Sequence, residues 1–498
     1  MNYYPNMQKN NNIAVYLFIF LCSFIISLFA ISSPIFQANI GDSAVFAYVA
    51  KIILDGGMPY RDTFDHKGPL IYLINVLGLL IDEHIGIWIV ELLTFLIIFI
   101  FTYKIARLLK CNRLVSCLLI IVGIVVLLYY FQGGNFTEEY ACAFITVSFF
   151  YFLKFFSDGH ITPCQASVCG KSFASVCLLR VNMIALWIVF VFGILVDLIK
   201  NQRIKVDFRF VGWFISGVLL VFIPHFLWLY FNNSFKFFFD DYVIFNFFYI
   251  SNHGQESLLN VFDAIVCFIS TPPVAASIVT LFYFSLKQNE EADWLSIITL
   301  SLSIIMESLS GRKYAHYGMI FYPFVMYTAS RLLSEYSSVN KEKIEYKKWR
   351  LYLGVLSSCF IGAIVFPMML TPPKASLAYL NDLKDTLTND NKIAGIIQSI
   401  TNSNDRISVV GNYNRLYLIS NRKSASKYSY QYPIANTNPN IWKEYINEIE
   451  NLTAKVIILS SDVGAIYPYK EIKKITDTYY RQISVVGNTE IYLLNEAN

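Results

Sequence analysis

Three residues with different acid–base chemistry stand side by side in the segment FDHKGPL, residues 64–70. Asp65 supplies a carboxylate, His66 an imidazole and Lys67 an ammonium group, directly before a strongly apolar run. A lysine can bind phosphate as a point charge, and a histidine can donate a hydrogen bond or bind a metal ion. The structural alternative is that Lys67 reaches from the lipid edge into water beside a loop histidine.

A further acid, Asp42, follows the first apolar segment of the chain, in GDSAVFAY. Residues 43–54 have apolar side chains at helical spacing, so we expect a helix that lies along the membrane surface and begins near Asp42. The Asp42 carboxylate is then a candidate general base at the lipid–water boundary. Aspartate is also a favoured N-cap residue, and the two roles are compatible.

Other charged residues cluster at the ends of apolar segments. One carboxylate near several cations suits displacement at a carbon bonded to phosphate, because the base activates an acceptor hydroxyl and the cations stabilise the leaving phosphate. Acids at a helix start also suit the helix dipole, which is the structural alternative. The residues that extend the set are Glu138 and Glu139 in NFTEEY, Arg180 in LLRVN, and Arg312, Lys313 and His316 in GRKYAHY.

Membrane helices must position these residues. The chain has 498 residues, of which 56% are hydrophobic and 15% charged, and its mean hydropathy is +0.49. Soluble domains usually carry about 25% charged residues, so we expect an α-helical polytopic membrane protein. The net charge of +4, spread over short loops, gives no footprint for nucleic acid. The nine cysteines form no CxxC pair, so we expect neither a disulfide framework nor a zinc site.

A membrane span needs about 20 apolar residues. The basic loops at 104–113, 200–209 and 341–350 mark the cytoplasmic side of the membrane. All three lie on that side only if the weakly apolar segment 162–180 also crosses the membrane. Burying the charge of Lys171 in that segment costs about 3 kcal/mol of insertion free energy. We expect about eleven spans, with the motif-bearing loops on the outer face. The clear candidates are 13–34, 86–108, 114–131, 139–157, 183–200, 210–231, 259–286, 294–310, 315–334 and 350–370.

The composition becomes polar after TPPK, residues 371–374. We therefore predict a membrane domain over residues 1–371, whose first outer loop, 35–85, carries Asp42, and a small exoplasmic α/β domain over residues 372–498. Patterns typical of strands and of a helix with an Asn-Pro start support this prediction. The expected strands are 406–411, 454–461 and 483–494, and the expected helix is 438–452.

The chain resembles the GT-C membrane glycosyltransferases, specifically bacterial proteins related to glycosyltransferase family 39. Relatives in that group include the protein O-mannosyltransferases and the lipid A aminoarabinose transferase. The resemblance spans residues 13–335 and rests on the order of GDSAVFAYVAKIILDGGMPYRDTFDHKGPL, GGNFTEEY, LLRVNMIALW and GRKYAHY. The tail RLYLISNRKSASKYSYQYP is similar to the exoplasmic domain of bacterial members.

The resemblance implies sugar transfer, with inversion, from a polyprenyl-phosphate donor on the outer face of the bacterial inner membrane. It implies that Asp42 is the general base and that Lys67 contacts the donor phosphate. Two departures stand out: Ser43 replaces a second acid, which Glu138 or Asp65 would then supply, and KGP replaces KPP, which makes the loop more flexible. From charge placement we predict further phosphate contacts, namely His66, Arg180, Arg312 and His316.

The sequence therefore predicts a membrane glycosyltransferase that acts on a glycan, glycolipid or protein acceptor, in contact with membrane lipid and with no nucleic-acid partner. It shows no required cofactor and leaves open whether a divalent metal ion assists. One rival is a polymerase or ligase of lipid-linked oligosaccharides. Another, from a different class, is a transporter or flippase of such lipids, for which inverted repeats and helices broken near the midplane are typical.

Overall fold

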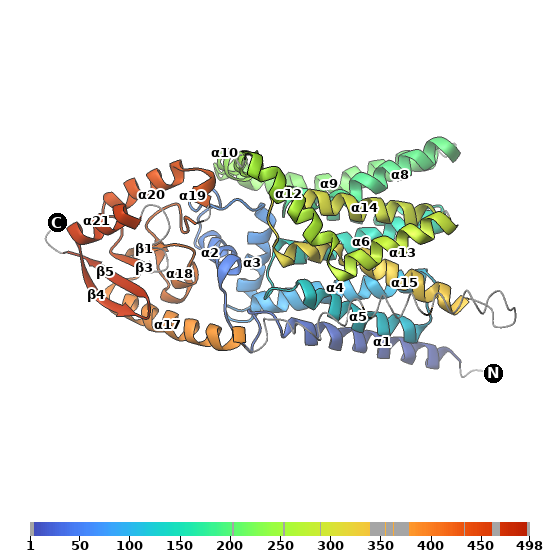
Figure 1. Ribbon diagram of the computed structural model, residues 1–498, viewed down its shortest axis with the longest axis horizontal. Coiled ribbons are helices and arrows are strands. Elements are labelled where there is room, and N and C mark those ends of the chain that lie inside the picture. Colours follow the sequence, from blue (N-terminus) through green and yellow to red (C-terminus); the bar gives the residue numbers. More distant parts are fainter. Residues whose placement is uncertain are drawn as a thin grey trace. The chain divides into compact units, whose positions relative to one another are not determined.

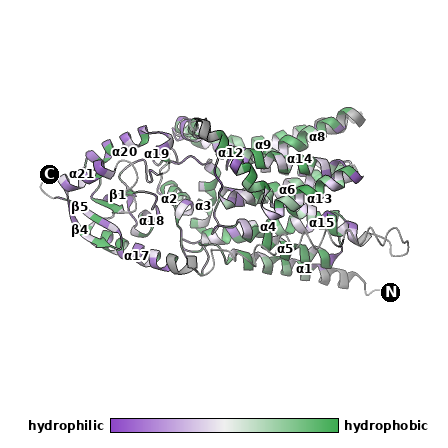
Figure 2. Cartoon of the chain, viewed as in Figure 1, coloured by the Kyte–Doolittle hydropathy of each residue, from purple (hydrophilic) through white to green (hydrophobic). Residues whose placement is uncertain are grey.

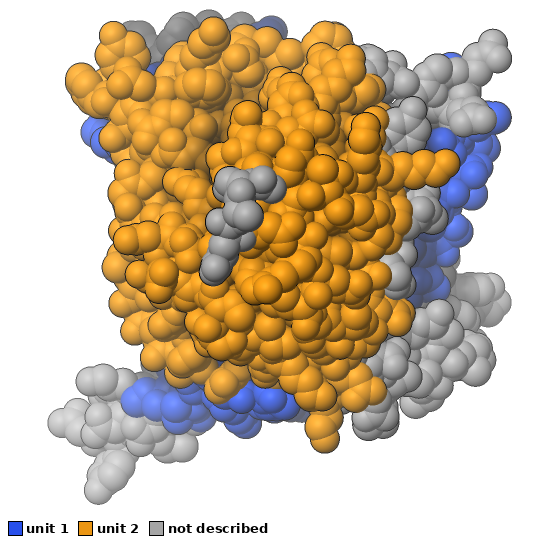
Figure 3. All heavy atoms as spheres, turned by 90° about the vertical axis from the view of Figure 1, so that its left-hand side faces the viewer, with its two compact units in different colours: residues 1–35, 88–225, 254–374 blue, residues 36–87, 226–253, 375–498 orange. Residues whose placement is uncertain are grey.

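The structure is a computed structural model of the chain. It describes residues 4–201, 204–251, 254–288, 290–338, 354, 362, 378–432, 434–460 and 469–495. The basic segment 341–350 lies outside these residues, as does the predicted span 350–370 apart from two positions. The chain forms two compact units (Figure 3). The helical unit comprises residues 1–35, 88–225 and 254–374, and the sheet unit comprises residues 36–87, 226–253 and 375–498.

Apolar helices build the helical unit, and Figure 2 shows hydrophobic residues along their length. Most of them coincide with a predicted span, which confirms a mainly helical membrane fold (Figure 1). The helices are α1 (Tyr4–Ser27), α4 (Gly86–Leu108), α5 (Arg113–Tyr130), α6 (Thr137–Asp158), α7 (Pro163–Cys177), η1 (Val181–Met183), α8 (Ala185–Asn201), α9 (Ile204–Phe231), α12 (Gly254–Ile269), α13 (Pro272–Gln288), α14 (Glu291–Ser308), η3 (Ala315–Phe321) and α15 (Tyr322–Ser338).

Four helices in the described part of the chain are long and apolar enough to cross a membrane. They are Gly86–Leu108, Arg113–Tyr130, Thr137–Asp158 and the Arg209–Phe231 part of α9. A fifth candidate is the pair Leu258–Ile269 and Pro272–Gln288, which bends by 76°. The crossing predicted for 259–286 stays a prediction, but the helix is broken near its centre. The physical reason is the Pro-Pro pair at its centre, because proline lacks an N–H and starts a helix more readily than it continues one.

Segment 162–180 forms a helix, α7, that starts at a capping box between Thr162 and Gln165. The helix has 15 residues and lies close against α9 at two glycines. A Cβ at Gly170 would stand 2.0 Å from the carbonyl oxygen of Phe214, and one at Gly217 would stand 2.1 Å from that of Ser167. Glycine is thus required for this backbone approach. The crossing by 162–180, and with it the number of eleven spans, stays a prediction.

A five-stranded sheet forms the core of the sheet unit, in the order β2-β1-β3-β5-β4. Strand β1 is parallel to β2 and β3, whereas β5 is antiparallel to β3 and β4. The strands are β1 (Arg406–Val410), β2 (Lys423–Ser424), β3 (Val456–Ser460), β4 (Tyr480–Val486) and β5 (Thr489–Leu494). The helices are α2 (Gly41–Leu54), α3 (Pro69–Ile81), α10 (Phe235–Phe238), η2 (Phe239–Ile244), α11 (Phe245–Ser251), α17 (Ala378–Ile400), α18 (Arg415–Ser420), α19 (Ile434–Thr437), α20 (Asn440–Glu450) and α21 (Tyr469–Tyr479).

The predicted strands at 406–411 and 454–461 and the predicted helix at 438–452 correspond to β1, β3 and α20. The predicted strand at 483–494 is instead a hairpin, because Gly487 adopts φ +58° and turns the chain between β4 and β5. A positive φ of this kind is the signature of a tight hairpin turn. A small C-terminal sheet is therefore present, while the boundary at residue 371 stays a prediction.

Helix α2 joins the core of the sheet unit. Its side chains Tyr48 and Ile52 pack in one cluster with Ile407, Val456 and Ile458 of the sheet. The Tyr48 and Tyr417 rings lie 4.9 Å apart, and the Tyr48 hydroxyl accepts a hydrogen bond from the backbone N–H of Ser424. The expected helix is present, but the expectation that its apolar face lies in the membrane surface is wrong, since protein covers that face.

Candidate functional site

The eight predicted site residues divide between the two units. The sheet unit contains Asp42, Asp65, His66 and Lys67, and the helical unit contains Glu138, Arg180, Arg312 and His316. Each group has its own local geometry, and we describe the two groups separately.

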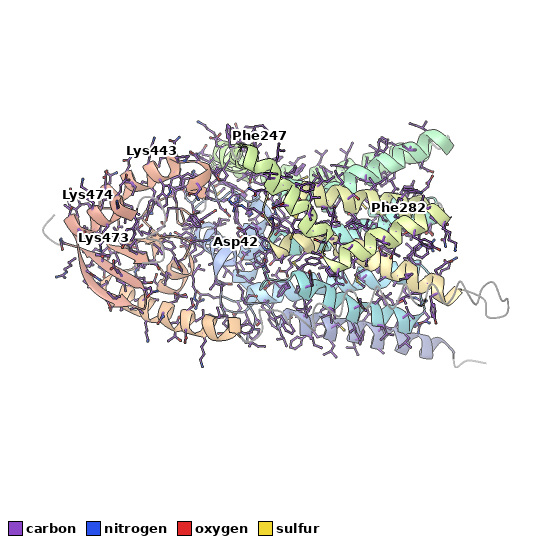
Figure 4. The ribbon with its side chains drawn as sticks, viewed as in Figure 1. Asp42, Phe247, Phe282, Lys443, Lys473 and Lys474 are labelled. Atoms are coloured by element: carbon purple, nitrogen blue, oxygen red, sulfur yellow. The ribbon has the colours of Figure 1, made fainter. Side chains whose placement is uncertain are left out.

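Asp42 lies in the first turn of α2, where Figure 4 labels it. The N-cap position belongs to Ile40, whose side chain makes no capping hydrogen bond, so the prediction that Asp42 caps the helix is wrong. A carboxylate in the first turn still faces the positive end of the helix dipole, which stabilises its negative charge. The side chain is half-buried. Asp42 is therefore a partly accessible carboxylate on a helix that the sheet unit holds firmly.

Helices α2 and α3 pack against each other through their N-terminal halves. The Phe46 ring, one turn after Asp42, lies 6.3 Å from the Tyr72 ring in the first turn of α3. Gly68 is the N-cap of α3, and Pro69 begins the helix. The N-terminus of a helix carries partial positive charge, which favours an anion nearby. Lys67 directly precedes one of them and Asp42 lies in the other.

Asp65 is the centre of a buried hydrogen-bond network just before Lys67. The Tyr72 hydroxyl donates to Oδ2 at 2.8 Å, and the Tyr430 hydroxyl donates to Oδ1 at 2.7 Å. The backbone N–H of His66 also donates to Oδ1, at 2.7 Å. Burial raises the pKa of the Asp65 carboxyl above its usual value, and the Tyr430 hydroxyl, the Lys67 charge and the Tyr72 hydroxyl offset part of this rise. These contacts favour a positioning role for Asp65 over a role as a second reacting acid.

The backbone on either side of Lys67 is also fixed. Tyr60 donates its hydroxyl to the Lys67 carbonyl oxygen at 2.7 Å, and the Asn246 side chain donates to the His66 carbonyl oxygen at 2.7 Å. Gly68 has φ −69° and ψ 158°, a conformation open to any residue. Neighbouring side chains thus hold the loop on either side of Lys67, and its greater flexibility stays a prediction. Within the described residues, no hydrogen bond or ion pair involves the half-buried Lys67 ammonium group.

The C-terminal part of the sheet unit contacts the same loop at further points. The backbone N–H of Phe64 donates to the Lys427 carbonyl oxygen at 2.9 Å. The Lys427 ammonium forms an ion pair with Asp241 at 3.0 Å and lies 5.8 Å from the Phe64 ring centroid. Burial raises the pKa of Asp241 to about 6, against the opposing effect of Lys427. The loop that carries Lys67 is thus held by residues 180 to 365 positions away in the sequence.

In the helical unit, Glu138 and Arg180 form a buried ion pair. Arg180 also pairs with Glu307 at 3.3 Å, and its guanidinium lies 4.2 Å from the Tyr317 ring centroid. Thr137 donates its hydroxyl to Glu138 at 2.9 Å. Two carboxylates already balance the charge of this arginine. The geometry thus favours a structural role for Glu138 and Arg180 over the predicted roles of second acid and phosphate contact.

His316 lies in η3 and is buried. Its ring is stacked on that of Phe136 at 4.1 Å, and its Nδ1 is 2.7 Å from the side-chain oxygen of Gln132. These contacts fix the imidazole in the protein interior and leave its predicted phosphate contact without direct support. Arg312 lies four residues earlier and is only partly buried. Its predicted phosphate contact stays a prediction.

The structure adds one acid that the sequence analysis did not select, Glu91, and places it beside Glu139, which the sequence analysis named. Glu91 accepts a hydrogen bond from the backbone N–H of Asn135 at 2.6 Å and another from Ser32, and Glu139 accepts one from the same Asn135 N–H at 2.9 Å. Both side chains are fully buried. A lone acid within an apolar span, such as Glu91 in WIVELLTF, is the signal that could have identified this pair.

No group of three or more His, Cys, Asp and Glu side chains that could hold a metal ion occurs among the residues that the structure describes. The carboxylates of the site are instead engaged with hydroxyl, backbone and guanidinium donors. Metal dependence stays an open part of the prediction.

Comparisons with known proteins identify the fold. Residues 6–371 match the family model described as "Putative competence-induced protein Ccs4 N-terminal domain". No curated protein sequence matches the chain significantly.

Solved structures are similar over nearly the whole chain. The crystal structure of ArnT from Cupriavidus metallidurans in the apo state has a TM-score of 0.62 at 13% identity and covers 97% of this chain and 98% of that one. The same protein bound to undecaprenyl phosphate has a TM-score of 0.59 at 13% identity, with 98% of each chain covered. The Archaeoglobus fulgidus oligosaccharyltransferase, in complex with Zn and sulfate, has a TM-score of 0.52 at 12% identity and covers 96% of this chain and 73% of that one. The chain therefore has the fold of ArnT and of this oligosaccharyltransferase, as the predicted GT-C fold requires.

Proposed function

Because the chain belongs to the family of the Ccs4 N-terminal domain, which residues 6–371 match, and has the GT-C fold, we propose that it is a membrane glycosyltransferase. It transfers a sugar, with inversion, from a polyprenyl-phosphate carrier to a glycan, glycolipid or protein. The reaction takes place on the outer face of the bacterial inner membrane. Support for the donor class comes from the similar ArnT structure, which binds undecaprenyl phosphate.

One observation supports this proposal above the others: α2 and α3 pack against each other, with the Phe46 ring 6.3 Å from the Tyr72 ring near their starts. Asp42 lies in the first turn of α2, and Lys67 stands directly before the N-cap of α3. The Lys67 ammonium is half-buried, while hydrogen bonds from Tyr60 and Asn246 hold its backbone neighbours in place. A fixed loop with a cation at a helix N-terminus is suited to a phosphate group.

In the proposed reaction, the Asp42 carboxylate takes the proton from the acceptor hydroxyl as that oxygen forms its bond to the anomeric carbon of the sugar. The bond from this carbon to the phosphate oxygen breaks at the same time, and polyprenyl phosphate leaves. Lys67, assisted by the N–H groups at the start of α3, stabilises the charge that develops on the leaving oxygen. His66 contributes a further hydrogen bond, and Arg312 stays a predicted phosphate contact.

The test is turnover by purified protein in lipid nanodiscs, supplied with a polyprenyl-phosphate sugar and its acceptor. Replacing a general base costs about 10²–10⁴-fold in rate, so Asp42→Asn should lose activity on this scale. The matched control is Asp55→Asn at the other end of the same helix, where the carboxylate pairs with Lys51 and Lys423 at 3.3 and 3.2 Å. Full turnover by the Asp42 variant would remove the base assignment. Movement of intact donor across a bilayer, without transfer, would favour the flippase.

A further inference from the structure

The segment from α10 to α11 has two faces of different chemistry. One face is buried and contacts the loop that carries Lys67. The Phe238 ring lies 5.5 Å from that of Tyr60, and the Phe245 ring lies 5.3 Å from that of Phe64. The other side is exposed and mainly apolar, with Lys236 and Asp240 as its charged residues. Its exposed apolar residues are Phe235, Phe237, Phe239, Val243, Ile244, Phe247 and Phe248.

This exposed face gathers several aromatic rings. Phe247, which Figure 4 labels, is 70% exposed, and Phe239 is 48% exposed. Contiguous exposed aromatic patches of this size mark a binding surface. The segment also contains a π-helical stretch, η2, and such stretches occur frequently at functional sites.

The chain itself indicates what covers this face. Helix α9 supplies a membrane span that ends at Phe231, and Tyr230 and Phe231 are exposed. The chain then turns at Asn233, which adopts φ +54°, and α10 begins at Phe235. The aromatic segment therefore follows the span after a turn of only three residues.

Side-chain packing keeps α10 at the level of the last turns of the span. The rings of Phe235 and Phe238 lie 5.9 and 6.1 Å from the ring of Phe226. Phe226 precedes the end of the span by five residues, which corresponds to about 7.5 Å along a helix axis. The chain thus folds back, so that α10 lies beside a part of α9 that belongs in the apolar layer.

We propose that the exposed face of the α10–α11 segment lies in the interfacial layer of the bilayer, with lipid acyl chains as its partner. Aromatic rings are enriched at this depth, and interfacial helices bury their apolar face about 5–10 Å into the boundary between headgroups and acyl chains. Lys236, on the same segment, is exposed and can reach the headgroups.

The proposal gives the Lys67 loop a fixed depth. Ser234, at the start of the segment, donates its hydroxyl to the Pro59 carbonyl oxygen at 2.5 Å, and Asn246 donates to the His66 carbonyl oxygen. One face of the segment would therefore lie in lipid, and the opposite face would hold the Lys67 loop at the bilayer surface. Only this last consequence rests on the proposed function; the lipid contact does not.

The experiment measures depth with a fluorophore, without any catalytic readout. An environment-sensitive NBD label is attached to Phe247→Cys or Phe239→Cys in full-length protein whose native cysteines have been replaced. The matched control is Lys474→Cys on α21, an exposed position that Figure 4 shows well apart from Phe247. The protein is reconstituted in vesicles of phosphatidylcholine and phosphatidylglycerol, with nitroxide lipids as quenchers.

Labels at residues 247 and 239 should be quenched by nitroxides on the upper acyl chain, at a depth of about 5–10 Å, and the label at 474 should not. Three outcomes would overturn the proposal. The first is equal behaviour at all three positions. The second is quenching by a nitroxide polyprenyl phosphate alone, which would identify the donor's chain as the occupant. The third is shielding that disappears on dilution with empty vesicles, which would identify a second copy.

Discussion

The two units hold their buried acids by different means. In the helical unit, Glu138 and Glu307 share the charged guanidinium of Arg180. In the sheet unit, Asp65 accepts hydrogen bonds from two tyrosine hydroxyls and a backbone N–H. Removing one partner of a buried ion pair strongly lowers the unfolding free energy, because the other charge stays buried without compensation. Neutral donors bind a carboxyl less strongly, yet they fix its orientation.

This difference separates structural from functional chemistry. Arg180 contacts Glu138 of α6, Glu307 of α14 and Tyr317 of η3, a group that we call the Arg180 cluster. The charges of this cluster are paired with one another inside the protein. Asp65 is held mainly by neutral donors, although the His66 ring nitrogen lies 3.5 Å from its Oδ1 and the Lys67 charge helps to lower its pKa. We propose that Lys67, which forms no ion pair among the described residues, uses its charge on a ligand. We therefore expect residues of the same type, all predicted as site residues, to have different roles in the two units.

The largest effect is expected for Arg180→Met, which leaves two buried carboxylates without their cation. Breaking such a pair costs about 3–5 kcal/mol of unfolding free energy. The control is Lys154→Met, which removes a surface pair with Asp158 at 4.0 Å and should cost about 0–1 kcal/mol. Thermal unfolding in detergent measures both. Equal midpoints for the two variants would mean that the Arg180 cluster is not a structural element.

A smaller effect is expected for Tyr430→Phe, which removes one neutral donor from Asp65. The loss of one partner of a buried group costs about 1–3 kcal/mol. If Tyr430 orients the Lys67 loop, donor affinity should fall more than the rate at saturating donor, a split that a merely structural role would not produce. The control is Tyr413→Phe, an exposed tyrosine of the same unit. Unchanged donor affinity in the Tyr430 variant would separate the C-terminal part from the site.

The smallest effect concerns Asp241, a sheet-unit acid held by a lysine, Lys427. Its folded pKa is raised to about 6, while the unfolded value is 3.8. The folded state therefore binds more protons, and its stability falls as pH rises through this range. We expect a loss of about 1 kcal/mol between pH 5 and pH 6. Asp241→Asn should remove this part of the pH dependence in thermal melts; parallel curves for both proteins would contradict the assignment.

Local patterns predicted the apolar helices, because an uninterrupted apolar run such as that of α4 or α5 has few alternatives in a membrane. The local patterns did not show the two places where the chain changes direction, the helix break before Pro272 and the hairpin turn at Gly487. They also failed for α2, since helical periodicity shows that one face is covered but not whether lipid or protein covers it.

The candidate site was predicted only in part. Lys67 and Asp42 could be selected from their neighbours in sequence and from the family resemblance. The hydrogen-bond and ion-pair partners of each charged side chain could not be selected from the sequence. Tyr430 is 365 positions from Asp65, and Glu307 lies in a different helix from Arg180. Only the tertiary structure shows that Arg180 is paired with two carboxylates and that Lys67 forms no ion pair with any residue that the structure describes.

The most direct test of the account is binding of undecaprenyl phosphate, without sugar, to purified protein in nanodiscs. Loss of one charge-assisted contact, worth about 1.5–3 kcal/mol, should weaken binding by Lys67→Met about 10- to 100-fold. Asp42→Asn, which removes only the base, and Lys51→Met, which removes a surface cation paired with Asp55, should both bind as the native protein does. Native affinity in the Lys67 variant, or equal losses in all three, would contradict the proposed phosphate site.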